Sequence, residues 1–193
     1  MNRIGLLGGS FDPPHKGHLT ISLEAKKIFS LKEVWWLVTP KNPLKIKKPA
    51  TYKERIYNCN EIIKNQPIKI KEYENNIGSN YSYKTVSYLN NKFKFYKFFW
   101  LMGADNLIHF HKWQKWEKIF HEVSIVVFRR HSYNGQAMNS LARKKYFNYH
   151  INPNKIDYSL FNKLPSWTYL KNKEIKISST EIRQQRVLLR GKN

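Results

Sequence analysis

The sequence has little of what would place a protein outside a reducing compartment or in a membrane. Its 193 residues include a single cysteine, Cys59, which excludes an internal disulfide framework. No apolar run approaches the roughly 18 residues that span a bilayer. No charged segment followed by an apolar stretch opens the chain, as it would in a secretory signal. These absences predict a cytoplasmic protein without a membrane partner, and the length predicts one domain over residues 1–193.

Acidic residues are scarce as well. The chain has 13 Asp and Glu against 35 Lys and Arg, which gives a formal net charge of +22. The lysines recur in nearly every segment and do not gather into one stripe, so we interpret the charge as a compositional bias. It still raises the local concentration of small anionic substrates. No specific nucleic-acid partner is expected. A basic nucleic-acid-binding module without catalysis is the alternative from another class, and it would bind DNA or RNA with a steep salt dependence.

Two common nucleotide-binding motifs are missing, namely the dinucleotide motif G-x-G-x-x-G and the Walker A motif G-x-x-x-x-G-K-[ST]. The chain has a glycine-rich turn of another kind, GGSFDPPHKGHL at residues 8–19. An apolar run at residues 4–7 precedes it, and apolar residues with helical spacing follow at 21–29. Gly8 and Gly9 suit a tight turn and a close approach of the backbone to a ligand. The turn is therefore predicted to be a phosphate loop between a strand and a helix.

Two histidines, His15 and His18, stand where this helix is expected to begin. Unpaired backbone N–H groups and the positive end of the helix dipole favour anions at such a place, and imidazoles can donate hydrogen bonds to a phosphate. Two alternatives remain. The pair could bind a metal, although no convincing third and fourth ligand accompanies it, so no metal site is expected. The histidines could also have a purely structural role, such as capping the helix.

Apolar runs alternate with helical patterns along the chain. Strands are expected at residues 4–7, 33–38, 68–70, 98–102, 123–128 and 175–177, and helices at 21–29, 52–64, 82–90, from 105, near 140–147 and from 178. Thr51 with Glu54 resembles a capping box, as do Ser178 and Glu181. The alternation predicts a Rossmann-like α/β fold, a doubly wound, mainly parallel sheet with helices on both faces. Ligands bind such sheets at the carboxyl ends of the strands, where the glycine-rich turn lies. The rest of 130–166 is expected to form loops.

Two segments resemble the motifs of the nucleotidyltransferase superfamily. Residues 9–18, GSFDPPHKGH, look like its H-x-G-H signature, and residues 177–183, ISSTEIR, look like I-S-S-T-x-x-R. Within the superfamily the chain is most similar to the bacterial nicotinate-nucleotide adenylyltransferases. This likeness is carried by Pro13-Pro14, by GADN at 103–106 with Trp113 after it, by YSYKT at 81–85 and by VFRR at 127–130. Leu44 departs from the pattern, because many members carry histidine there.

The resemblance implies transfer of AMP from ATP to nicotinate mononucleotide, giving the deamido dinucleotide of NAD biosynthesis and pyrophosphate, with Mg²⁺ accompanying ATP. The catalytic residues that it implies are His15, His18 and Arg183. For ATP binding it implies Gly8, Gly9, Ser10, Phe11, Gly103, Asp105, Ser178, Ser179 and Thr180. For mononucleotide binding it implies Lys45, Thr85, Trp113 and Arg130.

Plainer roles stay open for several of these residues. Trp113 or Trp116 could belong to the core, Thr85 could hydrogen-bond within its own helix, and Arg130 could be a solvated charge. Adenylyl transfer to phosphopantetheine is an alternative of the same class, although that related family usually has threonine where His15 stands. The preference for the acid or the amide mononucleotide and the oligomeric state are left open by the sequence.

Overall fold

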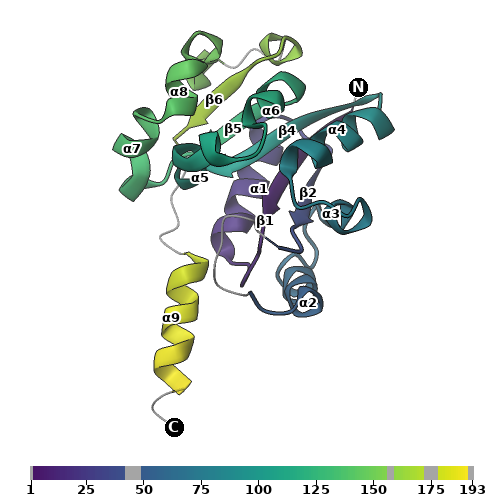
Figure 1. Cartoon of the computed structure of the whole chain (residues 1–193), viewed down its shortest axis with the longest axis vertical. Coiled ribbons are helices and arrows are strands. Elements are labelled where there is room, and N and C mark those ends of the chain that lie inside the picture. Colours follow the sequence, from purple (N-terminus) through teal and green to yellow (C-terminus); the bar gives the residue numbers. More distant parts are fainter. Residues whose placement is uncertain (1, 42–48, 156–158, 172–177, 191–193) are drawn as a thin grey trace.

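The computed structural model describes residues 2–41, 49–155, 159–171 and 178–190 (Figure 1). Its centre is a six-stranded sheet in which every neighbouring pair is parallel. The strands are β1 (Asn2–Gly9), β2 (Glu33–Val38), β3 (Ile68–Lys71), β4 (Tyr96–Gly103), β5 (Ser124–Phe128) and β6 (Trp167–Leu170). They lie in the order β3-β2-β1-β4-β5-β6. This order is that of the doubly wound Rossmann fold, which confirms the predicted fold class.

Helices connect the strands and cover both faces of the sheet. Their bounds are α1 (Lys16–Ile28), α2 (Tyr52–Ile62), α3 (Tyr73–Asn76), α4 (Ser82–Lys92), α5 (Ala104–His109), α6 (Trp116–Glu122), α7 (Asn134–Met138), α8 (Leu141–Lys145) and α9 (Ser179–Arg190). Thr51 caps α2 as expected, since its hydroxyl accepts a hydrogen bond from the Glu54 backbone N–H at 3.3 Å. Within the described part of the chain, no helix has the length and apolar character needed to cross a bilayer.

The sheet separates two hydrophobic cores. Successive side chains of a strand point to opposite faces, so Trp35 belongs to one core and Trp36 to the other, and Trp100 and Leu101 divide in the same way. One core is closed by α1 and α2, the other by α4 to α8. Burial of the strands on both faces explains the apolar runs in the sequence, because most side chains on either face pack into a hydrophobic core.

The strand order reverses between β1 and β4, which lie side by side with Leu7 opposite Leu101. The connection after β1 leads to α1 on one face, whereas the connection after β4 leads to α5 on the other. The two loops therefore diverge at the carboxyl ends of these strands and leave a crevice between them. The glycine-rich turn follows β1 and Gly103 ends β4, so both border this crevice.

The part of the chain after β5 departs from the sequence-based expectation. Residues 167–170 form β6, a four-residue edge strand that the pattern did not predict, and its side chains are all buried. The helix expected near 140–147 is present as α8. The strand expected at 175–177 lies outside the described residues. After it comes α9, which projects from the body of the fold in Figure 1.

Candidate active site

A cavity of about 660 Å³ opens at the point where the strand order reverses. Its size is typical of a site for a small molecule or cofactor. Of the residues expected to bind substrate, these line it: Gly8, Gly9, Ser10, Phe11, His15, His18, Gly103, Asp105, Trp113, Arg130, Ser178, Ser179 and Thr180. Thr85 and Arg183 are not among the lining residues, and Lys45 lies outside the described part of the chain.

The glycine-rich turn is shaped by its aromatic neighbours. A Cβ at Gly8 would lie 2.9 Å from the ring of Trp100, so glycine is needed here because a buried tryptophan occupies the space of its side chain. Phe11 adopts a left-handed backbone conformation, with φ of 48°, which is unfavourable for a bulky residue. Burial of its ring, stacked 4.7 Å from the ring of Trp36, offsets that cost. The conformation of the turn is therefore stabilised by packing against the buried rings of Trp36 and Trp100.

His15 and His18 form a reciprocal cap on α1. The Nδ1 atom of His15 accepts a hydrogen bond from the backbone N–H of Gly17 at 3.1 Å, and Nδ1 of His18 accepts one from the backbone N–H of His15 at 3.2 Å. These bonds correct the expectation of unpaired helix amides, since the amide of Gly17 already has a partner. They also show that capping and ligand binding do not exclude each other. An Nδ1 that accepts leaves the proton on Nε2, so each ring presents an N–H donor.

The pKa of His15 indicates that its ring is neutral. Burial is the main cause that lowers the pKa from 6.5 to about 4, and the positive charge of Arg130 lowers it further. The ring of His15 is therefore neutral at physiological pH, with its centre 3.9 Å from that of His18. The site presents a neutral N–H donor at this position rather than an imidazolium.

The loop after β4 forms the opposite wall. Arg130 Nη1 and Asp105 Oδ2 are 3.0 Å apart in an ion pair, with both side chains partly exposed. A Cβ at Gly103 would lie 2.4 Å from Asp105 Oδ1, so any side chain there would displace this carboxylate. Glycine at 103 therefore allows Asp105 to fold back over the end of β4, where it pairs with Arg130.

The two tryptophans that the sequence left undecided have different surroundings. Trp113 is partly buried and lines the cavity, while its ring contacts Phe110 and Trp100 edge-on. Trp116 packs against Phe110 and Tyr146 and does not line the cavity. Trp113 is thus held by core neighbours at the cavity wall, the arrangement required of a stacking platform.

Thr85 lies apart from the predicted mononucleotide site. It is fully buried on α4, and its hydroxyl has no hydrogen-bond partner among the described residues. Ser82, three residues earlier, lines the cavity together with Tyr81. The first turn of α4 therefore faces the site, whereas the next turn faces the core. Thr85 is therefore not among the residues that line the cavity, and its part in mononucleotide binding stays a prediction.

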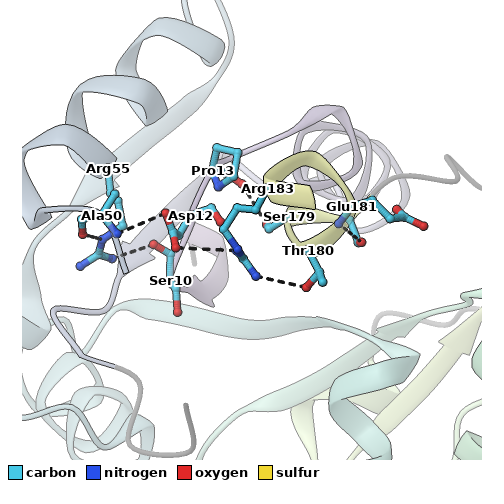
Figure 2. A network of polar contacts seen from close by, with 10 residues as sticks. Ser10, Asp12, Pro13, Ala50, Arg55, Ser179, Thr180, Glu181 and Arg183 are labelled. Atoms are coloured by element: carbon cyan, nitrogen blue, oxygen red, sulfur yellow. Dashed lines mark hydrogen bonds and ion pairs between the residues drawn. The ribbon is translucent and has the colours of Figure 1, made fainter. Parts of the chain in front are cut away.

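The last helix reaches the glycine-rich turn from the other end of the sequence (Figure 2). The hydroxyl of Ser179 donates to the carbonyl oxygen of Pro13 at 2.9 Å. Arg183 donates to the carbonyl oxygen of Asp12, and its guanidinium lies 3.7 Å from the Asp12 carboxylate. The hydroxyl of Ser178 accepts a hydrogen bond from the Glu181 backbone N–H, as expected for its cap. The two motifs that lie furthest apart in the sequence thus meet at one place.

Arg55, to which the sequence analysis gave no role, connects the loops around the site. Its side chain is 1% exposed. Its guanidinium donates to the carbonyl oxygens of Ser10, Thr39, Pro40 and Ala50 at 2.6, 2.8, 2.9 and 3.1 Å. These bonds tie the glycine-rich turn to the loops on either side of residues 42–48. A helical pattern such as that of 52–64 gives no sign of this role, because the bonds to Ser10, Thr39 and Pro40 reach backbone atoms 15 or more residues away in the sequence.

Glu74 is a second residue that the sequence analysis did not single out. It is buried, lines the cavity, and its Oε2 has no hydrogen-bond partner among the described residues. Burial raises the pKa of this carboxyl to about 7, and a hydrogen bond with Thr39 opposes the rise. Its position in a short helix after β3 carries no recognisable motif.

The described residues do not gather three His, Cys, Asp or Glu side chains that could hold a metal ion. The two aspartates nearest the site, Asp12 and Asp105, are each within ion-pair distance of an arginine. The cavity thus combines imidazole N–H donors, arginines and hydroxyls, a set suited to a polyphosphate.

Comparison with known proteins defines the class first. Residues 6–185 match the cytidylyltransferase-like family, and the chain belongs to this family. Among curated proteins it is 40% identical to a protein of Ruegeria sp. (strain TM1040), over 94% of this chain and 96% of the relative. It is 39% identical to one of Pelagibacter ubique (strain HTCC1062), over 94% and 92%. Both relatives carry the name "probable nicotinate-nucleotide adenylyltransferase". Within its class the chain thus belongs with the nicotinate-nucleotide adenylyltransferases.

Solved structures agree on the fold. The nicotinic acid mononucleotide adenylyltransferase of Plasmodium falciparum, complexed with NaAD, superimposes with a TM-score of 0.70. The match covers 95% of this chain and 83% of the other at 20% identity. The same enzyme complexed with APC gives a TM-score of 0.69. At this level of identity the likeness bears on the fold alone.

Proposed function

We propose that this protein transfers AMP from ATP to the 5′-phosphate of nicotinate mononucleotide, giving nicotinate adenine dinucleotide and pyrophosphate in NAD biosynthesis. One observation carries the proposal. The H-x-G-H turn and the I-S-S-T-x-x-R helix, from opposite ends of the sequence, meet beside one cavity where the strand order reverses. A site built from both ends also supports treating residues 1–193 as one domain. The lone, buried Cys59 supports the proposal that the enzyme works in the cytoplasm.

The reaction needs positioning and charge neutralisation more than a protein nucleophile. A phosphate oxygen of the mononucleotide is already ionised at neutral pH, so it attacks the α-phosphorus of ATP without a strong general base. The bond to the pyrophosphate oxygen breaks as the new phosphoanhydride bond forms. Cys59 cannot act as a nucleophile, because burial raises the pKa of its thiol to about 12.

The side chains at the cavity then take separate roles. The Nε2–H groups of His15 and His18 would donate to the charge that develops on the transferred phosphate, because their Nδ1 atoms are occupied by backbone donors. Arg183 would stabilise the departing pyrophosphate, together with the hydroxyls of Ser179 and Thr180. A neutral imidazole suits this task, since its Nε2–H can donate without a second proton on the ring.

The remaining residues fit the two nucleosides. Gly103 and the Asp105–Arg130 pair form the wall where adenosine or the mononucleotide phosphate would lie. Trp113 offers a ring face to the pyridine, and Ser82 at the start of α4 is the polar group we assign there. Lys45 stays a prediction for the mononucleotide, because it lies outside the described residues.

Enzymes that use ATP generally need a divalent metal, and we propose that it is Mg²⁺. The aspartates at this site are paired with arginines, so the described residues fit a metal that arrives on the phosphate oxygens rather than one held in a protein cage. When bound, Mg²⁺ would neutralise charge on the triphosphate.

A panel of acceptors tests the function directly. Pyrophosphate release from ATP and Mg²⁺ is measured with nicotinate mononucleotide, nicotinamide mononucleotide, phosphopantetheine or no acceptor. We expect release with nicotinate mononucleotide and a dinucleotide product by chromatography. Release with phosphopantetheine alone would move the protein to the neighbouring activity. No release with any acceptor would overturn the proposal.

A further inference from the structure

The guanidinium of Arg183 is held by the protein at the edge of the cavity. Its Nη1 donates to the Asp12 carbonyl oxygen and lies 3.7 Å from Asp12 Oδ2, and its Nη2 donates to the Thr180 hydroxyl at 3.2 Å. The Asp12 side chain is only 16% exposed, whereas that of Arg183 is 39% exposed. The aspartate is thus the more buried member of the pair.

Asp12 is itself fixed from the side opposite to Arg183 (Figure 2). Its Oδ1 accepts a hydrogen bond from the backbone N–H of Ala50 at 3.4 Å. The buried guanidinium of Arg55 holds the carbonyl oxygens of Ser10 and Ala50, at 2.6 and 3.1 Å. Arg55 therefore anchors the backbone two residues before Asp12 and the residue that donates to its carboxylate. The carboxylate lies between two arginines, the buried Arg55 and the partly exposed Arg183 of α9.

We propose that Asp12 is a positioning residue, whose carboxylate holds Arg183 of α9 in the orientation that receives the polyphosphate of ATP. This rests on the proposed function, because it assigns Arg183 to that ligand. Asp12 does not itself contact the substrate in this account. Its carboxylate contacts both the loop at Ala50, which Arg55 holds, and Arg183 of α9. The glycine-rich turn and the last helix are thereby placed on the same phosphates.

Asp12 carries a negative charge beside a site for an anion, so the direction in which ATP affinity changes when this charge is removed tests the proposal. If Asp12 acted only through its negative charge, it would repel the polyphosphate or compete with it for Arg183. Its removal would then tighten ATP binding. If Asp12 positions Arg183, removal of the charge weakens binding, because the guanidinium is no longer directed. The two accounts predict changes in opposite directions.

The first experiment compares Asp12→Asn with the wild type. The substitution keeps the shape of the side chain and an oxygen for the Ala50 N–H. The dissociation constant is measured by calorimetry for an ATP analogue with a methylene group between the α- and β-phosphates. We expect it to rise about tenfold, because the guanidinium loses the partly buried ion pair that directs it while its bond to the Asp12 carbonyl oxygen remains. The KM for the mononucleotide should stay within about twofold. An unchanged or lower dissociation constant would overturn the proposal.

Glu181→Gln is the matched control. Glu181 lies in the first turn of α9 and is exposed, and its substitution removes the same charge near the same site. We expect the analogue to bind this variant as tightly as the wild type or slightly more tightly, within about threefold. Weakening equal to that of Asp12→Asn would show that any substitution near the start of α9 disturbs the site, and it would contradict the positioning role of Asp12.

A double-mutant cycle with Arg183→Lys then tests whether Asp12 affects ATP binding through Arg183. If Asp12 acts through Arg183, Asp12→Asn should change the dissociation constant less than about twofold when lysine already stands at 183. Additive effects would contradict this route. The cycle uses binding alone, so it stands even if the acceptor panel gives no pyrophosphate, in which case the proposed function fails separately.

Discussion

Replacing His15 by asparagine should remove much of the acid sensitivity of this protein. Burial, with a contribution from Arg130, lowers the pKa of His15 from 6.5 to about 4 in the folded state. Above pH 6.5 the ring is neutral in both states, so it adds no pH dependence. As the pH falls from 6.5 towards 4, the unfolded chain binds a proton that the folded chain does not, and stability is lost.

The magnitude follows from the shift. Between pH 6.5 and pH 4 the difference between the two pKa values of His15 corresponds to about 3 kcal/mol of unfolding free energy. About 2 kcal/mol of this is lost by pH 5. Protonation would also give Nδ1 a hydrogen that opposes the Gly17 N–H, so the cap on α1 would break. Asparagine is a favoured N-cap residue and does not titrate. It should therefore keep the cap while removing the penalty.

Urea unfolding at about pH 7.5 and at about pH 5 checks this prediction for the wild type and for His15→Asn. The repulsion of a chain with net charge +22 contributes equally to both proteins, so the comparison cancels it. The wild type should lose about 2 kcal/mol more than the variant over this interval. Equal losses in the two proteins would show that His15 is not held neutral by the fold.

Three further substitutions test the site and its support. His18→Ala should keep the fold and lower kcat by roughly 10²- to 10³-fold, the effect of one lost donor to developing charge; steady-state kinetics with wild-type turnover would refute this role. Trp113→Ala should raise the KM for the mononucleotide more than the KM for ATP, because a stacking surface is lost; an unchanged KM would assign the ring to the core alone. Arg55→Lys should lower the unfolding free energy by about 3 kcal/mol. The ammonium of lysine has three N–H groups and cannot donate to all four carbonyl oxygens that the planar guanidinium binds. Urea unfolding measures the loss, and a change below about 1 kcal/mol would show that the buried fork is dispensable.

Local rules in the sequence account for much of the fold. Strands buried on both faces need continuous apolar runs, and the runs at 33–38 and 98–102 fall in β2 and β4. The cap at Thr51 depends on bonds within one turn, so its residue type reveals it. The short edge strand β6 escaped prediction because its stability comes from pairing with β5, through contacts some 40 residues apart.

The sequence by itself determined the chemistry available at the site: a glycine-rich turn with two histidines after the first strand, and hydroxyls with an arginine opening the last helix. Only the tertiary structure decided how these groups are used. The neutral state of His15 depends on burial by the rest of the chain. The placement of α4 puts its first residue, Ser82, at the cavity and Thr85, one turn further along, in the core. The Arg55 bonds and the contact of Arg183 with Asp12 join residues that are far apart in sequence. Short-range rules cannot reveal such contacts, because folding alone sets their distances.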